Sequence, residues 1–175
     1  MSPSSPLSPP PPARWAVWLA TGFGAGYLPK MPGTYGSIEG VGIYLAMDYA
    51  ARAVSLPRAG LAVLVLFLAA ISVWITAKAL PHFSSSDPQV IVIDEIAGQA
   101  VTLLGLAFWP GGARWGWIHI LAGFILFRIL DIAKPLLIRR ADKLPGAWGV
   151  VADDVSAGLT GGLLLWAWGQ FASTV

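Results

Sequence analysis

The chain has 175 residues, of which 56% are hydrophobic and only 11% are charged, with a net charge of +2. Soluble domains carry about 25% charged residues, so these charges are too few to cover a water-exposed surface, and the composition favours an integral membrane protein. The scattered basic residues argue against nucleic-acid binding, and the lack of cysteine excludes disulfides, cysteine-ligated zinc and thiol nucleophiles.

Residues 1–13 begin with MSPSSPLSPPPP, which has neither the basic start nor the apolar centre of a signal peptide. Their proline and serine content predicts a disordered tail. We expect residues 14–175 to form a single membrane-embedded helical domain.

The remaining chain alternates apolar segments with short polar stretches, which predicts an all-α integral membrane bundle of about four to six helices. Residues 61–80 match the roughly 20 apolar residues that a membrane crossing requires. Residues 90–93, VIVI, could form a strand, but we expect a helix, because Asp87-Pro88 suits a helix cap and first turn and an isolated strand in lipid would leave its backbone unpaired. The apolar segments are 15–28, 38–54, 61–80, 96–109, 115–130 and 155–171.

Most acidic residues fall toward one end of the bundle if the six segments alternate in direction. Asp142 lies in a loop at that end, and only Asp48 lies elsewhere. We therefore expect a polar site at one membrane edge. The other carboxylates of that end are Glu39, Asp87, Asp94, Glu95, Asp131, Asp153 and Asp154.

The stretch FILFRILDIAKP, residues 124–135, carries Arg128, Asp131 and Lys134 at intervals of three. Helical residues at this interval share a face, and charges near hydrocarbon are costly, so the stripe indicates a function. A pair of intrahelical salt bridges is the alternative interpretation.

Two pairs of adjacent acids, Asp94-Glu95 and Asp153-Asp154, stand close to the starts of apolar helices. Neighbouring helical residues point about 100° apart, so in Asp94-Glu95 we expect one acid to reach a shared centre and the other to orient it. Simple complementarity between carboxylates and the helix dipole is the alternative for both pairs.

These acids, brought together, would repel one another unless they bound a cation. Hard oxygen donors without cysteine or suitable histidine favour Mg²⁺ over zinc. Arg128 and Lys134 would then supply donors for an anionic group such as phosphate, and the whole set indicates phosphoryl chemistry. The residues expected to ligate the metal and to act in catalysis are Asp94, Glu95, Asp131, Asp153 and Asp154.

The glycine-rich stretch GFGAGYLPKMPGTYGS, residues 22–37, lacks the spacing of a P-loop. Its PGTYGS part precedes an apolar helix and offers backbone N–H groups, two hydroxyls and a positive helix end, which suit a phosphate. We expect Gly33, Thr34 and Ser37 to bind substrate together with the two cations. A turn that lets helices pack closely is the alternative.

The sequence resembles the phosphatidylglycerophosphatase A family in three segments that occur in the family's order: residues 22–37, 93–103 and 127–158. The resemblance implies a Mg²⁺-dependent phosphatase of the bacterial inner membrane that converts phosphatidylglycerophosphate into phosphatidylglycerol. It also implies functional roles for Gly33, Thr34, Ser37, Asp94, Glu95, Arg128, Asp131, Lys134, Asp153 and Asp154. The chain departs from the family's pattern at Glu39, Leu137 and Ala147.

We hypothesise that a water activated by the metal, or one of the aspartates, attacks phosphorus in line with the leaving glycerol oxygen. The phospholipid substrate would stay in the bilayer during this step. Two alternatives remain: a CDP-alcohol phosphatidyltransferase, whose DG-x2-AR pattern is absent, and a divalent-cation transporter, which Arg128 and Lys134 disfavour because they would repel the ion. The alternation places seven basic residues on the site's side and four opposite, which predicts a multi-pass protein with a cytoplasmic site. The four opposite residues are Arg14, Arg52, Arg58 and Arg114.

Overall fold

The computed structural model describes residues 13–109, 115–135 and 144–172. All regular secondary structure among these residues is helical, and they contain no strand. The all-α prediction is therefore confirmed. Two short 3-10 turns, Ala25–Tyr27 and Leu80–His82, accompany the helices. The α-helices are α1 (Arg14–Ala20), α2 (Pro32–Ala53), α3 (Arg58–Ala79), α4 (Ile93–Ala107), α5 (Trp117–Ala133) and α7 (Ala147–Ala172).

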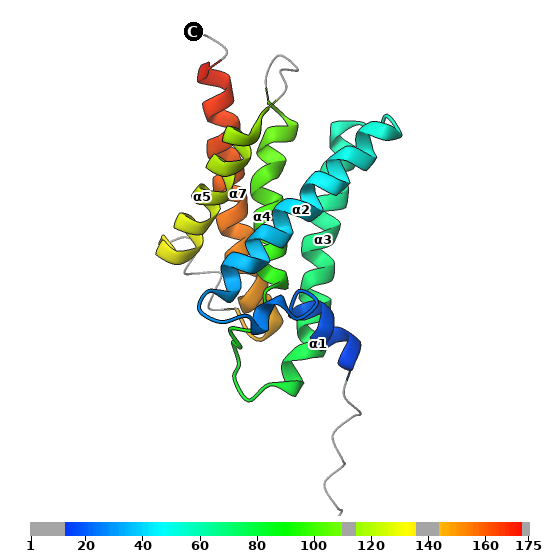
Figure 1. The fold of residues 1–175 in the computed structure, drawn as a ribbon, viewed down its shortest axis with the longest axis vertical. Coiled ribbons are helices and arrows are strands. Elements are labelled where there is room, and N and C mark those ends of the chain that lie inside the picture. The colour runs from blue at the N-terminus through cyan, green and yellow to red at the C-terminus, as the bar shows by residue number, and fades with distance from the viewer. Residues whose placement is uncertain (1–12, 110–114, 136–143, 173–175) are drawn as a thin grey trace, which may run out of the picture.

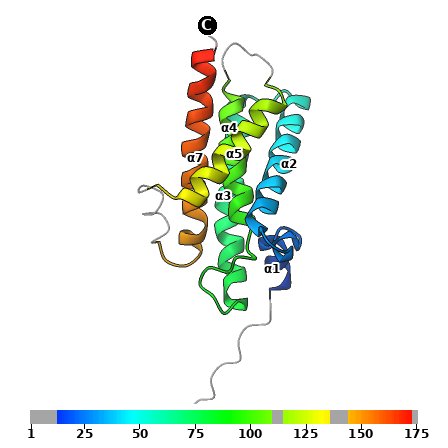
Figure 2. The same ribbon diagram turned by 60° about the vertical axis from the view of Figure 1, so that its left-hand side comes forward.

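The five long helices alternate in direction, as Figures 1 and 2 show. The starts of α2, α4 and α7 and the ends of α3 and α5 consequently lie toward the same end of the bundle, the lower end in Figure 1. This arrangement agrees with the alternation expected from the apolar segments, and it gathers the acid-bearing helix ends.

Helix α1 departs from that alternation. It has seven residues and a length of about 10 Å, far short of a crossing. It lies beside the last turns of α3, where the Trp15 and Trp74 rings are 5.1 Å apart and the Ala13 N–H donates to His82 Nε2 at 3.0 Å. Arg14 therefore lies at the site end of the bundle, and its sequence-based placement at the opposite end is wrong.

Helix α4 forms the centre of the bundle, and nearly all its side chains are buried. It approaches α7 closely because glycines face each other: a Cβ on Gly98 would lie 2.6 Å from the Asp154 carbonyl oxygen, and a Cβ on Gly105 would meet the Gly162 carbonyl. Such glycine contacts allow two helix backbones to approach closely. They hold the start of α7 against the start of α4.

Residues 90–92 are not helical, and the prediction for this segment is wrong. Helix α4 begins only at Ile93. The Val92 N–H donates to the Ala20 carbonyl at 2.8 Å, and the Ile91 N–H donates to the Pro88 carbonyl at 2.9 Å. The backbone groups are satisfied by a turn and by the end of α1, so no helix is needed to pair them.

Two helical stretches in the described part of the chain are long and apolar enough to cross a membrane: Arg58–His82 and Ala147–Ala172. Large apolar side chains are also exposed on every long helix except α4, among them Phe67, Trp117 and Phe171. Contiguous apolar exposure on this scale is uncommon for a soluble monomer and is typical of a surface that contacts lipid or another protein.

Candidate functional site

A cavity of about 540 Å³ opens at the end of the bundle where the acids gather. It is lined from the first turns of α2, α4 and α7, the last turn of α5 and the loops before α2 and α4. Nine of the ten residues expected at a site line it: Gly33, Thr34, Asp94, Glu95, Arg128, Asp131, Lys134, Asp153 and Asp154. Ser37 lies behind this wall and contacts Arg128.

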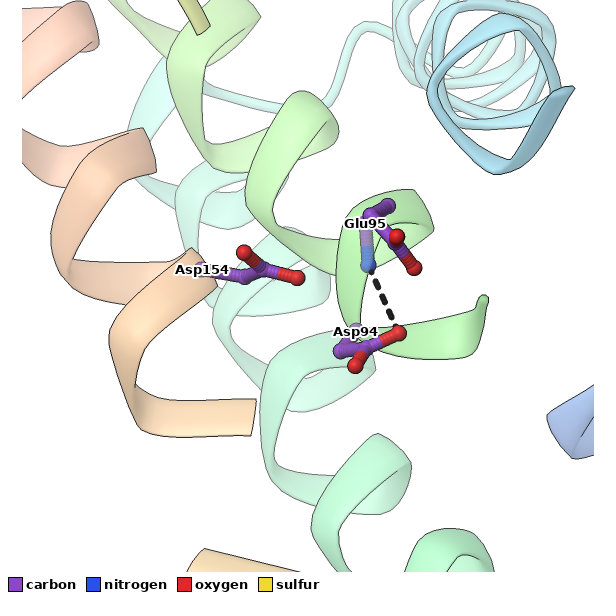
Figure 3. A group of neighbouring side chains, drawn as sticks. All are labelled: Asp94, Glu95 and Asp154. Carbon is purple, nitrogen blue, oxygen red and sulfur yellow. Dashed lines mark hydrogen bonds between the residues drawn. The ribbon is translucent and has the colours of Figure 1, made fainter. Parts of the chain in front are cut away.

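Three carboxylates converge within the cavity. Asp94, Glu95 and Asp154 each offer an oxygen, and these oxygens all lie within 4.8 Å of one another. Figure 3 shows Asp154 reaching from α7 toward the first turn of α4. Asp94 and Asp154 are only 7% and 4% exposed, and Glu95 Oε2 is buried without a hydrogen-bond partner among the described residues.

Both members of the Asp94-Glu95 pair reach the shared centre, so neither serves merely to orient the other. The Glu95 N–H donates to Asp94 Oδ1 at 3.1 Å, the dashed contact in Figure 3, and this bond holds the Asp94 side chain over the start of the helix. The glutamate side chain is longer than that of aspartate, so Glu95 can reach the shared centre although neighbouring helical positions point about 100° apart. Burial raises the pKa of both carboxyls, and the neighbouring Glu95 charge raises the pKa of Asp94 further.

The donor set of this cluster fits a hard divalent cation. The buried carboxylates of Asp94 and Asp154 and the half-buried carboxylate of Glu95 provide oxygen ligands with overlapping reach, and the unpartnered Glu95 Oε2 lacks the bond that a buried polar atom normally has. A bound cation would supply that partner and offset the mutual repulsion of the acids.

Arg128 and Asp131 form an intrahelical ion pair with a distance of 2.8 Å between Nη1 and Oδ2. Lys134 instead pairs with Asp153 on α7. Lys134 caps α5 with a left-handed backbone conformation, φ 39°, and its N–H donates to the Leu130 carbonyl at 2.9 Å. The salt-bridge interpretation of the stripe is therefore correct for Arg128, whereas the end of α5 directs Lys134 to a second helix.

The PGTYGS stretch is itself the first part of α2, which begins at Pro32; the expectation that it precedes the helix is wrong. A proline at the first helical position fixes φ for the helix and lacks only an N–H that has no intrahelical partner there. A Cβ on Gly33 would meet Glu95 Oε1 and lie 3.1 Å from Arg128 Nη1. The close-packing interpretation thus applies at Gly33, and this packing brings the start of α2 against the charged cluster.

Ser37 connects the two helices behind the cavity. Its hydroxyl donates to the Gly33 carbonyl at 2.8 Å and accepts from Arg128 Nη1 at 3.3 Å. Because Ser37 is fully buried, we assign it to holding the guanidinium, and direct contact with a ligand in the cavity is not supported by its position.

The cavity also includes side chains that were not assigned to the site, namely Lys30, Ser86, Asp87 and Gln89. Lys30 precedes α2 in a left-handed conformation, φ 83°. It stands inside the glycine-rich stretch 22–37, so its closeness in sequence to PGTYGS could have identified it as a site residue. Gln89 belongs to the loop that was wrongly expected to be helical. Asp142 and the loop cations Arg139, Arg140 and Lys143 lie outside the described residues.

Comparison with known proteins assigns this arrangement to a family. The sequence profile described as Phosphatidylglycerophosphatase A matches residues 18–168, which include every residue named in the cluster. The chain belongs to this family. The cavity at which four helix ends meet is therefore the site of a phosphatidylglycerophosphatase A family member.

Three relatives show how far the likeness extends. A Bacteroides thetaiotaomicron protein, provisionally named a phosphatidylinositol-3-phosphatase, is 36% identical over 88% of this chain and 93% of its own length. The Escherichia coli phosphatidylglycerophosphatase A is 34% identical over 81% and 76%, and that of Haemophilus influenzae is 32% identical over 85% of each chain. No solved structure matches the chain at a significant level.

Proposed function

We propose that this family member is a Mg²⁺-dependent phosphatase that hydrolyses the terminal phosphate monoester of phosphatidylglycerophosphate, giving phosphatidylglycerol. The observation that carries the proposal is the cluster of three converging carboxylates, two of them buried, beside Arg128 and Lys134 in a single cavity. The names of the Escherichia coli and Haemophilus influenzae relatives supply the substrate.

Asp94, Glu95 and Asp154 would hold the metal, because their oxygens converge. Bound there, Mg²⁺ would neutralise charge on the phosphate and lower the pKa of a water molecule. Asp131 and Asp153 line the same cavity, but each has a cationic partner, so we assign them first to orienting Arg128 and Lys134. Since both acids line the cavity, either could also accept a proton from the attacking water.

Arg128 and Lys134 would bind the phosphate oxygens. The planar guanidinium can donate two parallel bonds to one phosphate, while the ammonium acts as a point charge. The Gly33 backbone N–H, in the first turn of α2, would add a donor, and Thr34 would add its hydroxyl, because its own N–H already donates to the Met31 carbonyl at 3.0 Å. Holding the phosphate from several directions would fix it for in-line displacement of the glycerol oxygen.

The cavity would lie at headgroup depth in the bacterial inner membrane, and the protein would cross the bilayer several times. The asymmetry of basic residues supports a cytoplasmic site. Arg52 and Arg58, at the end of α2 and the start of α3, lie at the other end of the bundle. The described cations of the site end are Arg14, Lys30, Lys78, Arg128 and Lys134.

A second candidate substrate is a phosphatidylinositol phosphate, because the Bacteroides thetaiotaomicron relative is named for one. Both candidates are phosphate monoesters on a lipid headgroup, and the same cluster would act on either. A phosphatidyltransferase would instead release CMP from a CDP-lipid, and a transporter would carry divalent cations without releasing phosphate.

The deciding experiment measures phosphate release by the full chain in mixed micelles that contain phosphatidylglycerophosphate, with Mg²⁺ or with EDTA. We expect release only with Mg²⁺, and a faster rate than with phosphatidylinositol 3-phosphate. Asp131→Asn should remove most of the activity, whereas Asp48→Asn, which removes a carboxylate at the opposite end, should not. Equal rates in EDTA would refute the metal, and near-normal turnover by Asp131→Asn would refute its role.

A further inference from the structure

A groove with a volume of about 490 Å³ lies between α2 and α5, and apolar side chains alone line it. Its wall on α2 includes Ile38 and Val41, and its wall on α5 includes Trp117, Leu121 and Phe124. Nothing in the charged cluster requires this groove, and apart from the indole N–H of Trp117 its side chains offer no polar partner.

The groove continues the wall of the charged cavity on both helices. On α2 the cavity residue Thr34 is followed by Ile38 after four positions and by Val41 after three more. These intervals keep the side chains on one face of a helix. The cavity and the groove are therefore successive parts of one helix face.

The same continuity holds on α5. Arg128 lines the cavity, and Phe124, Leu121 and Trp117 follow toward the other end of the helix at intervals of four, three and four. The Arg128 guanidinium also bonds to Ser37 of α2, so a fixed cation stands where the cavity passes into the groove. A molecule that occupies both would place an anionic part beside Arg128 and an apolar part along Phe124.

The path from Arg128 in the cavity to the far end of the groove matches the depth of one leaflet. Arg128 and Trp117 are eleven residues apart, about 16 Å along an α-helix. Half of a hydrocarbon core that is about 30 Å thick is about 15 Å. A chain that starts at the cavity and follows the groove would end near the bilayer midplane.

Two other apolar grooves do not connect to the cavity. Between α4 and α7 the path is closed where Gly98 and Gly158 bring the two backbones into contact. Along α3 and α7 there is no continuation on α3, because no residue of that helix lines the cavity. The α2–α5 groove alone, among these three, shares a face with the cavity on both its helices.

We propose that the α2–α5 groove binds one acyl chain of the phospholipid substrate and thereby presents the headgroup phosphate to the charged cavity. This inference rests on the proposed phosphatase function. Since lipid tails are as apolar as the groove, its contribution is to position the chain, and it adds little hydrophobic driving force. The groove should therefore affect turnover of long-chain lipids and leave short-chain analogues unaffected.

The test compares dioleoyl and dibutyryl phosphatidylglycerophosphate, which share a headgroup, as substrates of the full chain in detergent. Leu121→Trp fills the groove at a side chain that is 52% exposed. We expect kcat/KM for the dioleoyl substrate to fall about tenfold, because the chain can no longer occupy the groove, with the dibutyryl value within about twofold. Ile38→Trp fills the groove from α2 and should give the same selective loss. This second variant keeps the test valid if Leu121→Trp fails to fold.

Leu163→Trp is the matched control, because Leu163 is 65% exposed and lines the α4–α7 groove that the glycine contact separates from the cavity. It should leave both substrates unchanged. Equal losses on the two substrates in Leu121→Trp and Ile38→Trp, or no loss in either, would overturn the acyl-chain site and leave the phosphatase function intact. If the unmodified chain released phosphate from neither substrate, the proposed function and this inference would both fail.

Discussion

The contact between Gly98 and α7 provides a sharp test of whether Asp154 acts in the site. In Gly98→Ala the new Cβ would lie 2.6 Å from the Asp154 carbonyl oxygen, whereas an ordinary contact begins at 3.4 Å. The start of α7 must therefore move away from α4 by about 0.8 Å. The Phe127 ring, also 2.6 Å from the new Cβ, limits relief in the other direction.

Two magnitudes follow from this displacement. Overpacking of a tight contact costs about 1–3 kcal/mol, of which the better helix propensity of alanine returns up to about 1 kcal/mol. A reacting group that is misplaced by about 1 Å can lose about 100-fold in rate. We expect Gly98→Ala to lower the specific activity by about 10- to 100-fold, with a modest loss of thermal stability.

The assay is phosphate release per folded protein, measured beside the thermal midpoint in the same detergent. Gly105→Ala is the matched control, since its Cβ would meet the Gly162 carbonyl at the same interface, about 10 Å further along α4. It should lose comparable stability and keep most of its activity. Near-normal activity in Gly98→Ala, or an equal loss in Gly105→Ala, would show that the separation of Asp154 from Asp94 does not control the reaction.

Two further predictions concern the charged groups. Arg128→Lys keeps the charge but removes the planar guanidinium that contacts both Ser37 and Asp131. We expect kcat/KM to fall about 10- to 100-fold, and the rate at saturating substrate to stay well below that of the unmodified chain. A change in kcat/KM below twofold would contradict the assigned role. Mg²⁺ should raise the thermal midpoint of the unmodified chain by binding its folded state, and Asp94→Asn should abolish this shift. A shift that persisted in Asp94→Asn would place the ion elsewhere.

Sequence patterns alone predicted the helices and the end of the bundle at which the site lies. Apolar segment length and helix-breaking residues are local properties, so α3, predicted at 61–80, is found at Arg58–Ala79. Alternation of direction then follows for long helices joined by short connections. The convergence of Asp94, Asp131 and Asp153 on one cavity needed no further information.

Side-chain partners and backbone approaches were decided by the tertiary structure. Lys134 pairs with Asp153 nineteen residues away, and Ser37 bonds to Arg128 ninety-one residues away. Neither pair has a sequence signature, because each depends on the rotation and separation of two helices, which the Gly98–Gly158 contact and similar packing set. For the same reason residues 90–92 follow the hydrogen bonds available at the end of α1, against the helix that the preceding Asp87-Pro88 favoured.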